Sequence, residues 1–221
     1  MEFRILGPLE VRSEGRELSL GGAKQRALLA VLLLHKNEVV SIDRLVDELW
    51  GDQPPATAFK VVHVYVSQLR KALRDRGGRG DEERVLVTRA PGYMLCVEPG
   101  QLDADRFEGL VDQARQELAA GRARRAAHML LEALALWRGP AFADFALDAF
   151  AQNEIARLEE ARISAVEDRI EADLAVGRHS EVVGELESLV AAHPLRERLR
   201  GPAEQRHASR SPVAHGDGVC R

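Results

Sequence analysis

The segment from residue 57 to residue 76 constrains the fold of this chain most, because it combines an apolar stripe with a cationic face. Its aliphatic side chains recur at helical positions i, i+4, i+7 and i+11, namely Val62, Val66, Leu69 and Leu73. On a helix these side chains form one stripe, which must be buried against a core. The same segment contains five lysines or arginines and a single acid, Asp75. The sequence therefore predicts a helix with one structural face and one face that suits a polyanion.

The face opposite the apolar stripe has the side chains of a DNA-contacting surface. With about 3.6 residues per turn it comprises Lys60, Val61, Val64, Ser67, Gln68 and Lys71, with His63, Arg70 and Arg74 at its edges. Cations neutralise phosphates, whereas amides, hydroxyls and methyl groups contact base edges in the major groove. Charged faces also occur on ordinary surface helices, so this pattern alone leaves a solvated helix as the alternative.

Length and composition indicate a soluble protein of two domains. The 221 residues exceed one typical domain of about 100–200 residues, and no apolar run approaches the roughly 18 residues of a membrane span. The first residues, Met1 to Arg4, do not form a basic segment followed by an apolar one, so the sequence predicts no secretory signal and a cytoplasmic location. Cys96 and Cys220 show no ligand spacing and are expected to be free thiols.

The residues before the predicted helix at 57–76 predict a small antiparallel sheet and two further helices. Apolar alternation predicts short strands at 3–6, 9–11 and 18–20. Between residues 23 and 35 apolar side chains occupy nearly all sides, which is typical of a central helix covered by its neighbours. Ser41 is a good N-cap for a second helix over residues 42–50, and Gly51 ends it.

The predicted helix at 57–76 and the residues after it complete a winged helix-turn-helix. Thr57 is the expected N-cap, although Lys60 occupies the position at which a capping box has Glu. After a loop at 77–80, strand-like runs at 85–88 and 93–97 flank a Pro-Gly turn, with Arg89 at the tip of the hairpin. Three helices followed by such a hairpin place the third helix in the major groove, and the wing reaches phosphates or the minor groove.

Several longer runs in this half carry a family resemblance. They are FRILGPLEV, GGAKQRALLAVLLL, VDELWGDQPPATA, YVSQLRKAL and RAPGYML. Residues 1–97 resemble the DNA-binding domain of OmpR-type regulators, and the runs together are similar to the Streptomyces antibiotic regulatory protein family. The resemblance implies a four-stranded N-terminal sheet, a recognition helix at about 57–75, and dimeric or tandem binding to direct repeats in double-stranded DNA. It also implies contact with RNA polymerase and its sigma factor.

When the DNA-contacting positions of the family are transferred to the matching positions of this sequence, the resemblance assigns DNA contacts to individual residues. Base edges are assigned to His63, Val64, Ser67 and Gln68. Phosphates are assigned to Lys60, Tyr65, Arg70 and Lys71. Trp50 and Thr57 would donate hydrogen bonds to the DNA backbone, and Arg89 would enter the minor groove. Two alternatives stay open, because Tyr65 can close the edge of the core and Trp50 can belong to it.

The second half is predicted to be helical, and it begins after Pro99-Gly100. We expect a DNA-binding domain at 1–98, a helical domain at 102–200 and a disordered tail at 201–221. Asp103 and Asp105 favour a helix start. Residues 118–122 and 174–178 share the pattern Leu-Ala-x-Gly-Arg, which is typical of turns in tetratricopeptide-like helical repeats, although the spacing exceeds their length of about 34 residues.

The run WRGPAFADF and the long helix that follows it resemble the bacterial transcriptional activation domain of the same family. Such helical repeats expose a concave surface, so we expect this half to mediate oligomerisation, such as homodimer formation, or to bind partners. After residue 200 the sequence departs from the family, which predicts a truncated terminus. The apolar face of the helix around residues 182–190 would then lie exposed.

The sequence contains no motif typical of nucleotide binding, nucleophilic catalysis or metal binding. The sequence therefore predicts neither an enzyme nor a cofactor or metal site. It also has no aspartate-rich receiver segment for control by phosphorylation. The acids at 159–160 and 167–168 are expected on helix surfaces, paired with arginines.

Two functional hypotheses follow from the sequence. The first is a sequence-specific transcriptional activator of a secondary-metabolite, or antibiotic, biosynthetic gene cluster. The alternative is a helical-repeat interaction module with only weak or non-specific DNA binding.

Overall fold

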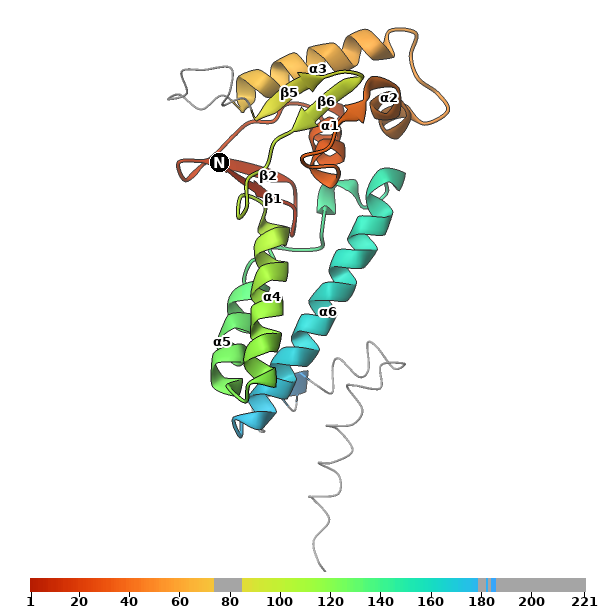
Figure 1. The fold of residues 1–221 in the computed structure, drawn as a ribbon. Coiled ribbons are helices and arrows are strands. Elements are labelled where there is room, and N and C mark those ends of the chain that lie inside the picture. Colours follow the sequence, from red (N-terminus) through yellow and green to blue (C-terminus); the bar gives the residue numbers. More distant parts are fainter. Residues whose placement is uncertain (74–84, 179–181, 183, 186–221) are drawn as a thin grey trace, which may run out of the picture.

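The molecule is elongated, with an α+β half at one end and a bundle of helices that extends from it (Figure 1). The structure is a computed structural model, and it describes residues 1–73, 85–178, 182 and 184–185. The predictions for the loop at 77–80, for most of the helix around 182–190 and for the tail at 201–221 lie outside these residues. Val182, which is described, is 1% exposed, so the expected exposure of that apolar face is wrong at this residue. In the described part, the predicted fold class is confirmed: a winged helix-turn-helix precedes an all-helical half.

The N-terminal sheet consists of β1 (Glu2–Arg4), β2 (Glu10–Ser13) and β3 (Arg16–Glu17), all antiparallel. The predicted third strand at 18–20 is wrong. Glu14 and Gly15 both have positive φ angles, and such a two-residue turn lets the return strand begin at once. The implied four-stranded sheet is also corrected, since the sheet has three strands among the described residues.

Three helices follow as predicted: α1 (Ala23–Leu34), α2 (Ile42–Trp50) and α3 (Ala58–Ala72). Ser41 caps α2, because its Oγ accepts a hydrogen bond from the N–H of Arg44 at 3.2 Å. Thr57 stands at the N-cap position of α3, but its side chain makes no capping hydrogen bond. Its backbone has φ −100° and ψ 9°, outside the extended conformation that a capping side chain needs.

The hairpin after α3 consists of β5 (Leu86–Arg89) and β6 (Gly92–Leu95). A further strand, β4 (Val40–Ser41), which the sequence did not predict, pairs with β6. A Cβ atom on Gly92 would lie 1.8 Å from the carbonyl oxygen of Val40, so this close pairing requires glycine. The hairpin is thereby attached to the start of α2 as well as to α3.

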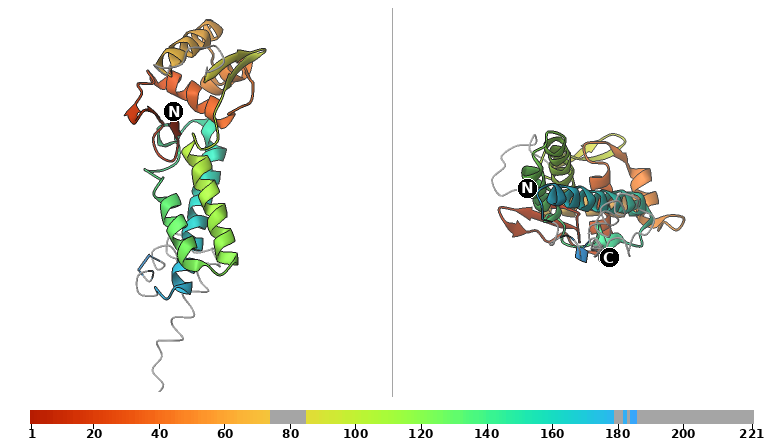
Figure 2. Two further views of the ribbon diagram at one scale, coloured as in Figure 1. Left: turned by 60° about the vertical axis from the view of Figure 1, so that its left-hand side comes forward. Right: turned by 90° about the horizontal axis from the view of Figure 1, so that it is seen from below.

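The helical half contains α4 (Asp103–Ala119), α5 (Ala123–Leu134) and α6 (Gln152–Ala175), with short 3-10 turns at Ala143–Phe145 and Ala149–Ala151. The helices run side by side (Figures 1 and 2). Both copies of the repeated sequence pattern end a helix in the same way. Gly121 and Gly177 have positive φ angles, and their N–H groups bond back to Leu118 and Leu174. The pattern therefore encodes a shared helix end.

Two acids that the sequence placed on the surface of α6 are buried. Glu167 is 7% exposed and Asp168 is 3% exposed. The expected pairing with arginine is confirmed for Asp168, whose carboxylate accepts a hydrogen bond from Nε of Arg115 at 2.7 Å. Arg115 belongs to α4, so this buried acid has a partner on a helix that is distant in sequence.

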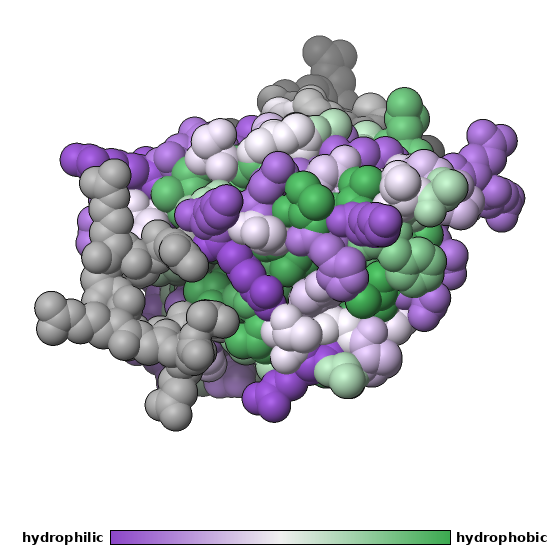
Figure 3. Space-filling view, turned by 90° about the horizontal axis from the view of Figure 1, so that it is seen from above, coloured by the Kyte–Doolittle hydropathy of each residue, from purple (hydrophilic) through white to green (hydrophobic). Residues whose placement is uncertain are grey.

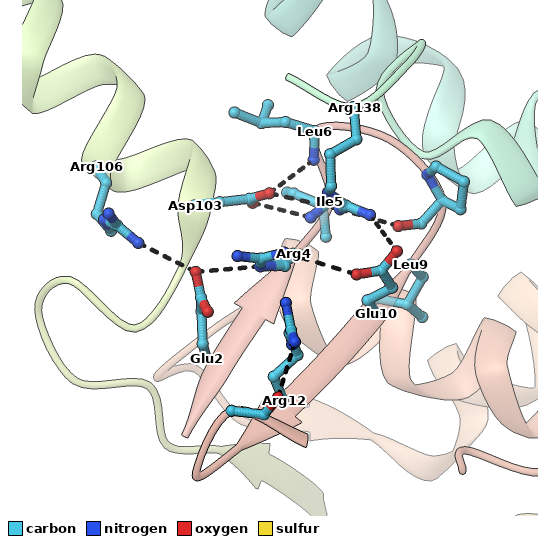
Figure 4. Close-up of polar contacts among 12 residues, drawn as sticks. Glu2, Arg4, Ile5, Leu6, Leu9, Glu10, Arg12, Asp103, Arg106 and Arg138 are labelled. Carbon is cyan, nitrogen blue, oxygen red and sulfur yellow. Dashed lines mark hydrogen bonds and ion pairs between the residues drawn. The ribbon is translucent and has the colours of Figure 1, made fainter. Parts of the chain in front are cut away.

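The two halves share one hydrophobic core and several polar links (Figure 4). Asp103 accepts hydrogen bonds from the N–H groups of Ile5 and Leu6 at 2.8 and 3.1 Å. Arg138 bonds to the carbonyl oxygen of Pro8 at 3.1 Å and pairs with Glu10 at 2.6 Å. These contacts hold the bundle against the N-terminal sheet, on the side away from α3 (Figure 1).

Candidate nucleic-acid interface

Helix α3 is buried along one face and exposed along the other. The four residues of the predicted apolar stripe, Val62, Val66, Leu69 and Leu73, are between 0 and 4% exposed. The exposed residues are Thr57, Phe59, Lys60, His63, Val64, Ser67, Gln68 and Lys71. Because the buried face fixes the rotation of the helix, the side chains of the second group all point away from the core.

This end of the molecule carries interleaved polar and apolar side chains rather than one uniform patch (Figure 3). Val64 is 51% exposed and Phe59 is 49% exposed, so two large apolar side chains of α3 face outward. Between them and around them lie amide, hydroxyl and ammonium groups. The major groove of DNA has phosphates at its rims, and its floor presents the polar edges of the bases and the methyl groups of thymine. A surface that mixes cationic, polar and apolar side chains can therefore contact all of these groups.

His63 contacts the wing hairpin. Its Nδ1 lies 2.5 Å from Oη of Tyr93 on β6, and the two rings meet edge to face with centroids 6.1 Å apart. Tyr93 is 5% exposed, whereas His63 is exposed. Burial raises the pKa of the Tyr93 phenol, and the positive charge of Arg70 partly opposes this rise. The phenol is therefore protonated at neutral pH.

Arg70 connects α3 to the same hairpin. Its Nε donates to the carbonyl oxygen of Leu86 at 2.9 Å, and its Nη2 donates to Oγ1 of Thr88 at 2.8 Å. The guanidinium also lies 5.7 Å from the centre of the Tyr93 ring, within the range of a cation–π contact. Arg70 is thus half-buried and partly committed to holding helix and wing together, a role that the sequence did not indicate.

The other predicted contact residues fall into two groups. Lys60, Lys71 and Arg89 are exposed, and Arg89 ends β5 beside the turn of the hairpin, as predicted. Trp50 and Tyr65 are partly exposed and pack against the hydrophobic core. Trp50 and Tyr65 thus both contribute to the core, which was the alternative to DNA contact for each of them. Both side chains also remain partly accessible.

Sequence reasoning missed Phe59 and Thr88 as exposed residues of this surface, and Tyr93 as a buried residue in contact with it. Phe59 lies outside the apolar stripe of α3, and from this position its exposure could have been predicted. Tyr93 reads as an inward-facing strand residue, and its contact with His63 depends on how the hairpin folds against α3. Such a contact has no signature in local spacing.

A helix with one exposed polar face, held beside an antiparallel hairpin by the two preceding helices, defines a protein of the winged helix-turn-helix class. Two family models match the chain in agreement with this class. Residues 15–95 match "Transcriptional regulatory protein, C terminal", and residues 102–203 match "Bacterial transcriptional activator domain".

Proteins that are similar to this chain over most of its length identify the family within this class. Regulatory protein DnrI of Streptomyces peucetius is 36% identical over 202 residues, which cover 90% of this chain and 74% of DnrI. Regulatory protein AfsR of Streptomyces coelicolor is 40% identical over 201 residues, covering 90% of this chain and 19% of AfsR. This chain belongs to the Streptomyces antibiotic regulatory protein family of transcriptional regulators.

Mycobacterial proteins are similar as well. Transcriptional regulatory protein MoaR1 of Mycobacterium tuberculosis is 40% identical over 200 residues, which cover 90% of this chain and 64% of MoaR1. The solved structure of Mycobacterium tuberculosis EmbR in complex with a low-affinity phosphopeptide superposes with a TM-score of 0.86 at 36% identity, covering 93% of this chain and 54% of EmbR. This chain thus spans only part of several relatives. In its described part, no helix has both the length and the apolar character needed to cross a membrane.

Proposed function

We propose that this chain is a sequence-specific DNA-binding transcriptional activator that inserts α3 into the major groove. The observation that supports this most directly is the fixed rotation of α3: its aliphatic face is buried, so one polar face points outward beside an exposed wing. Winged-helix proteins place their recognition helix and wing on DNA in this arrangement.

The exposed groups suggest how contacts are divided. His63, Val64, Ser67 and Gln68 lie along the middle of the exposed face and would meet base edges. Contacts to phosphates and sugars would come from the flanks and ends of that face, through Thr57, Lys60, Tyr65, Arg70 and Lys71, and from Trp50 at the end of α2. Arg89, at the end of β5, would reach the neighbouring minor groove.

The helical half would work from a fixed position relative to the DNA. Buried contacts of Asp103 and a shared core join it to the N-terminal sheet, so it cannot swing freely about a linker. We propose that the protein acts in the cytoplasm, binds direct repeats as a homodimer or tandem pair, and presents this half to RNA polymerase and its sigma factor. We propose a biosynthetic gene cluster, such as one for an antibiotic, as its target, because the chain belongs to the Streptomyces antibiotic regulatory protein family.

A footprinting experiment on the promoters nearest to its own gene tests the proposal. We expect protection of a repeated sequence that persists in excess non-specific competitor DNA, and increased transcription from that promoter with purified polymerase. Uniform, weak binding that competitor DNA abolishes would instead support a helical interaction module with only non-specific DNA binding.

A further inference from the structure

The contact between His63 and Tyr93 joins an exposed imidazole to a buried phenol. Oη of Tyr93 is 2.5 Å from Nδ1 of His63, and this hydroxyl makes no other hydrogen bond with a described residue. No described residue bonds to the second ring nitrogen of His63, Nε2. Among the described residues, Nε2 is therefore left available to a ligand or to solvent.

One placement of the hydrogens satisfies both groups. A phenol has one hydrogen to donate, and a neutral imidazole has one N–H and one bare nitrogen. If the hydrogen of His63 were on Nδ1, the buried phenolic hydrogen would be left without an acceptor among the described residues, which is costly. If Tyr93 donates to Nδ1, its hydroxyl is satisfied and the imidazole hydrogen lies on Nε2.

Arg70 reinforces this direction of donation. Its guanidinium is held by Leu86 and Thr88 and lies 5.7 Å from the Tyr93 ring centre. A nearby cation makes a phenol more willing to donate its hydrogen and less willing to accept one. Burial meanwhile raises the pKa of Tyr93, so that the hydrogen is retained at neutral pH.

We propose that Tyr93 is a positioning residue for sequence recognition, because it holds His63 as the Nε2–H tautomer and thereby makes His63 a hydrogen-bond donor toward DNA. This inference rests on the proposed function. A donor selects base edges that carry acceptors, such as O6 and N7 of guanine or O4 of thymine. It disfavours cytosine, which presents only a donor amino group in the major groove. His63 should therefore favour guanine or thymine over cytosine at one operator position.

Substitution of Tyr93→Phe tests this inference, because it removes the phenolic oxygen and keeps the ring under Arg70. Binding of the variant would be measured against operators randomised at each position. We expect discrimination against cytosine at one position to fall about fivefold, the weight of one net hydrogen bond, with preferences elsewhere unchanged. Tyr65→Phe is the comparison, because it removes a phenolic oxygen on α3 that we assign to phosphate: it should lower the affinity for all sequences alike and leave this base preference intact.

A double-mutant cycle with His63→Ala separates this role from general packing of the wing. If Tyr93 acts through His63, Tyr93→Phe should have no further effect on base preference in the His63→Ala background. An equal effect in both backgrounds would overturn the inference. Thermal denaturation of each variant shows whether it is folded.

The tautomer can also be read in the unmodified protein, independently of any variant. Nitrogen-15 NMR of the imidazole at alkaline pH, where ordinary imidazoles are neutral, should show the hydrogen of His63 on Nε2. A hydrogen on Nδ1 in a protein that binds its operator would refute the inference and leave the proposed function standing. Absence of any sequence-specific complex would refute the proposed function, and this inference with it.

Discussion

The carboxylate of Asp103 accepts a hydrogen bond from the backbone N–H of Ile5, 98 residues earlier in the chain, at 2.8 Å. Its other oxygen accepts from Leu6 at 3.1 Å, and the guanidinium of Arg138 lies 3.7 Å away. Asp103 is 2% exposed and is the first residue of α4. The start of the helical half is therefore anchored on the backbone of the N-terminal half, and this buried side chain adds to the shared core and the other polar links between the two halves.

Substitution of Asp103→Asn should destabilise the protein. The amide has only one acceptor oxygen, so the N–H of Ile5 or Leu6 would face an NH2 group. We expect the free energy of unfolding to fall by about 1–3 kcal/mol, the usual cost of a buried unsatisfied donor, as measured by urea denaturation. Asp112→Asn is the control, because Asp112 is an exposed acid of the same helix, and its loss should cost less than about 0.5 kcal/mol.

The contribution of Asp103 to stability should depend on pH. Burial raises its pKa above the ordinary 3.8, and the N–H groups of Ile5 and Leu6 and the charge of Arg138 oppose the rise. A raised pKa in the folded state means that this contribution is fully present below pH 3.8 and decreases as pH rises through the folded pKa. The stability difference between the wild type and Asp103→Asn should therefore shrink with rising pH above 3.8. Growth of this difference over the same interval would contradict the expectation.

Local periodicity predicted the three helices of the N-terminal half and the hairpin, because each buries one stripe or face and the stripe repeats at the period of the element. The sites that it missed depend on contacts between distant segments. Asp103 was read only as a helix start, and Asp168 as a surface acid, since neither Ile5 nor Arg115 is near them in sequence. The face of α3 could be predicted, but the bonds of Arg70 and His63 to the wing could not, because they depend on how the hairpin folds back.

Substitution of Gly92→Ala should damage the wing specifically. The new Cβ would lie 1.8 Å from the carbonyl oxygen of Val40, and backbone cannot yield as a flexible side chain does. We expect a loss of about 3 kcal/mol or more in the free energy of unfolding, together with weaker DNA binding. Gly109→Ala provides the contrast, because Gly109 lies within α4 with open space around it. It should stabilise the protein by about 0.5–1 kcal/mol, and similar effects of both substitutions would argue against the close contact.

The division of α3 into base-reading and phosphate-binding residues predicts two different phenotypes. Gln68→Ala should relax preference at particular operator positions by about 1–3 kcal/mol, because amides read base edges. Lys60→Ala should weaken binding to all sequences alike and reduce the salt dependence of the binding constant by about one unit, since one phosphate contact is lost. Titrations of specific and random duplexes at several salt concentrations distinguish these effects. If neither substitution alters a footprint, α3 is not the recognition helix.

Arg70 and Lys71 are adjacent cations with different surroundings, and their removal should separate structure from DNA binding. Arg70→Ala removes two hydrogen bonds to β5 and the cation over Tyr93, so the free energy of unfolding should fall by about 1–2 kcal/mol. Lys71→Ala removes an exposed ammonium from a helix, so stability should change by less than about 0.5 kcal/mol while affinity for all DNA sequences falls. Chemical denaturation and duplex titration of both variants provide the comparison. Equal stability of the two variants would mean that the hydrogen bonds of Arg70 to β5 do not stabilise the packing of α3 against the wing.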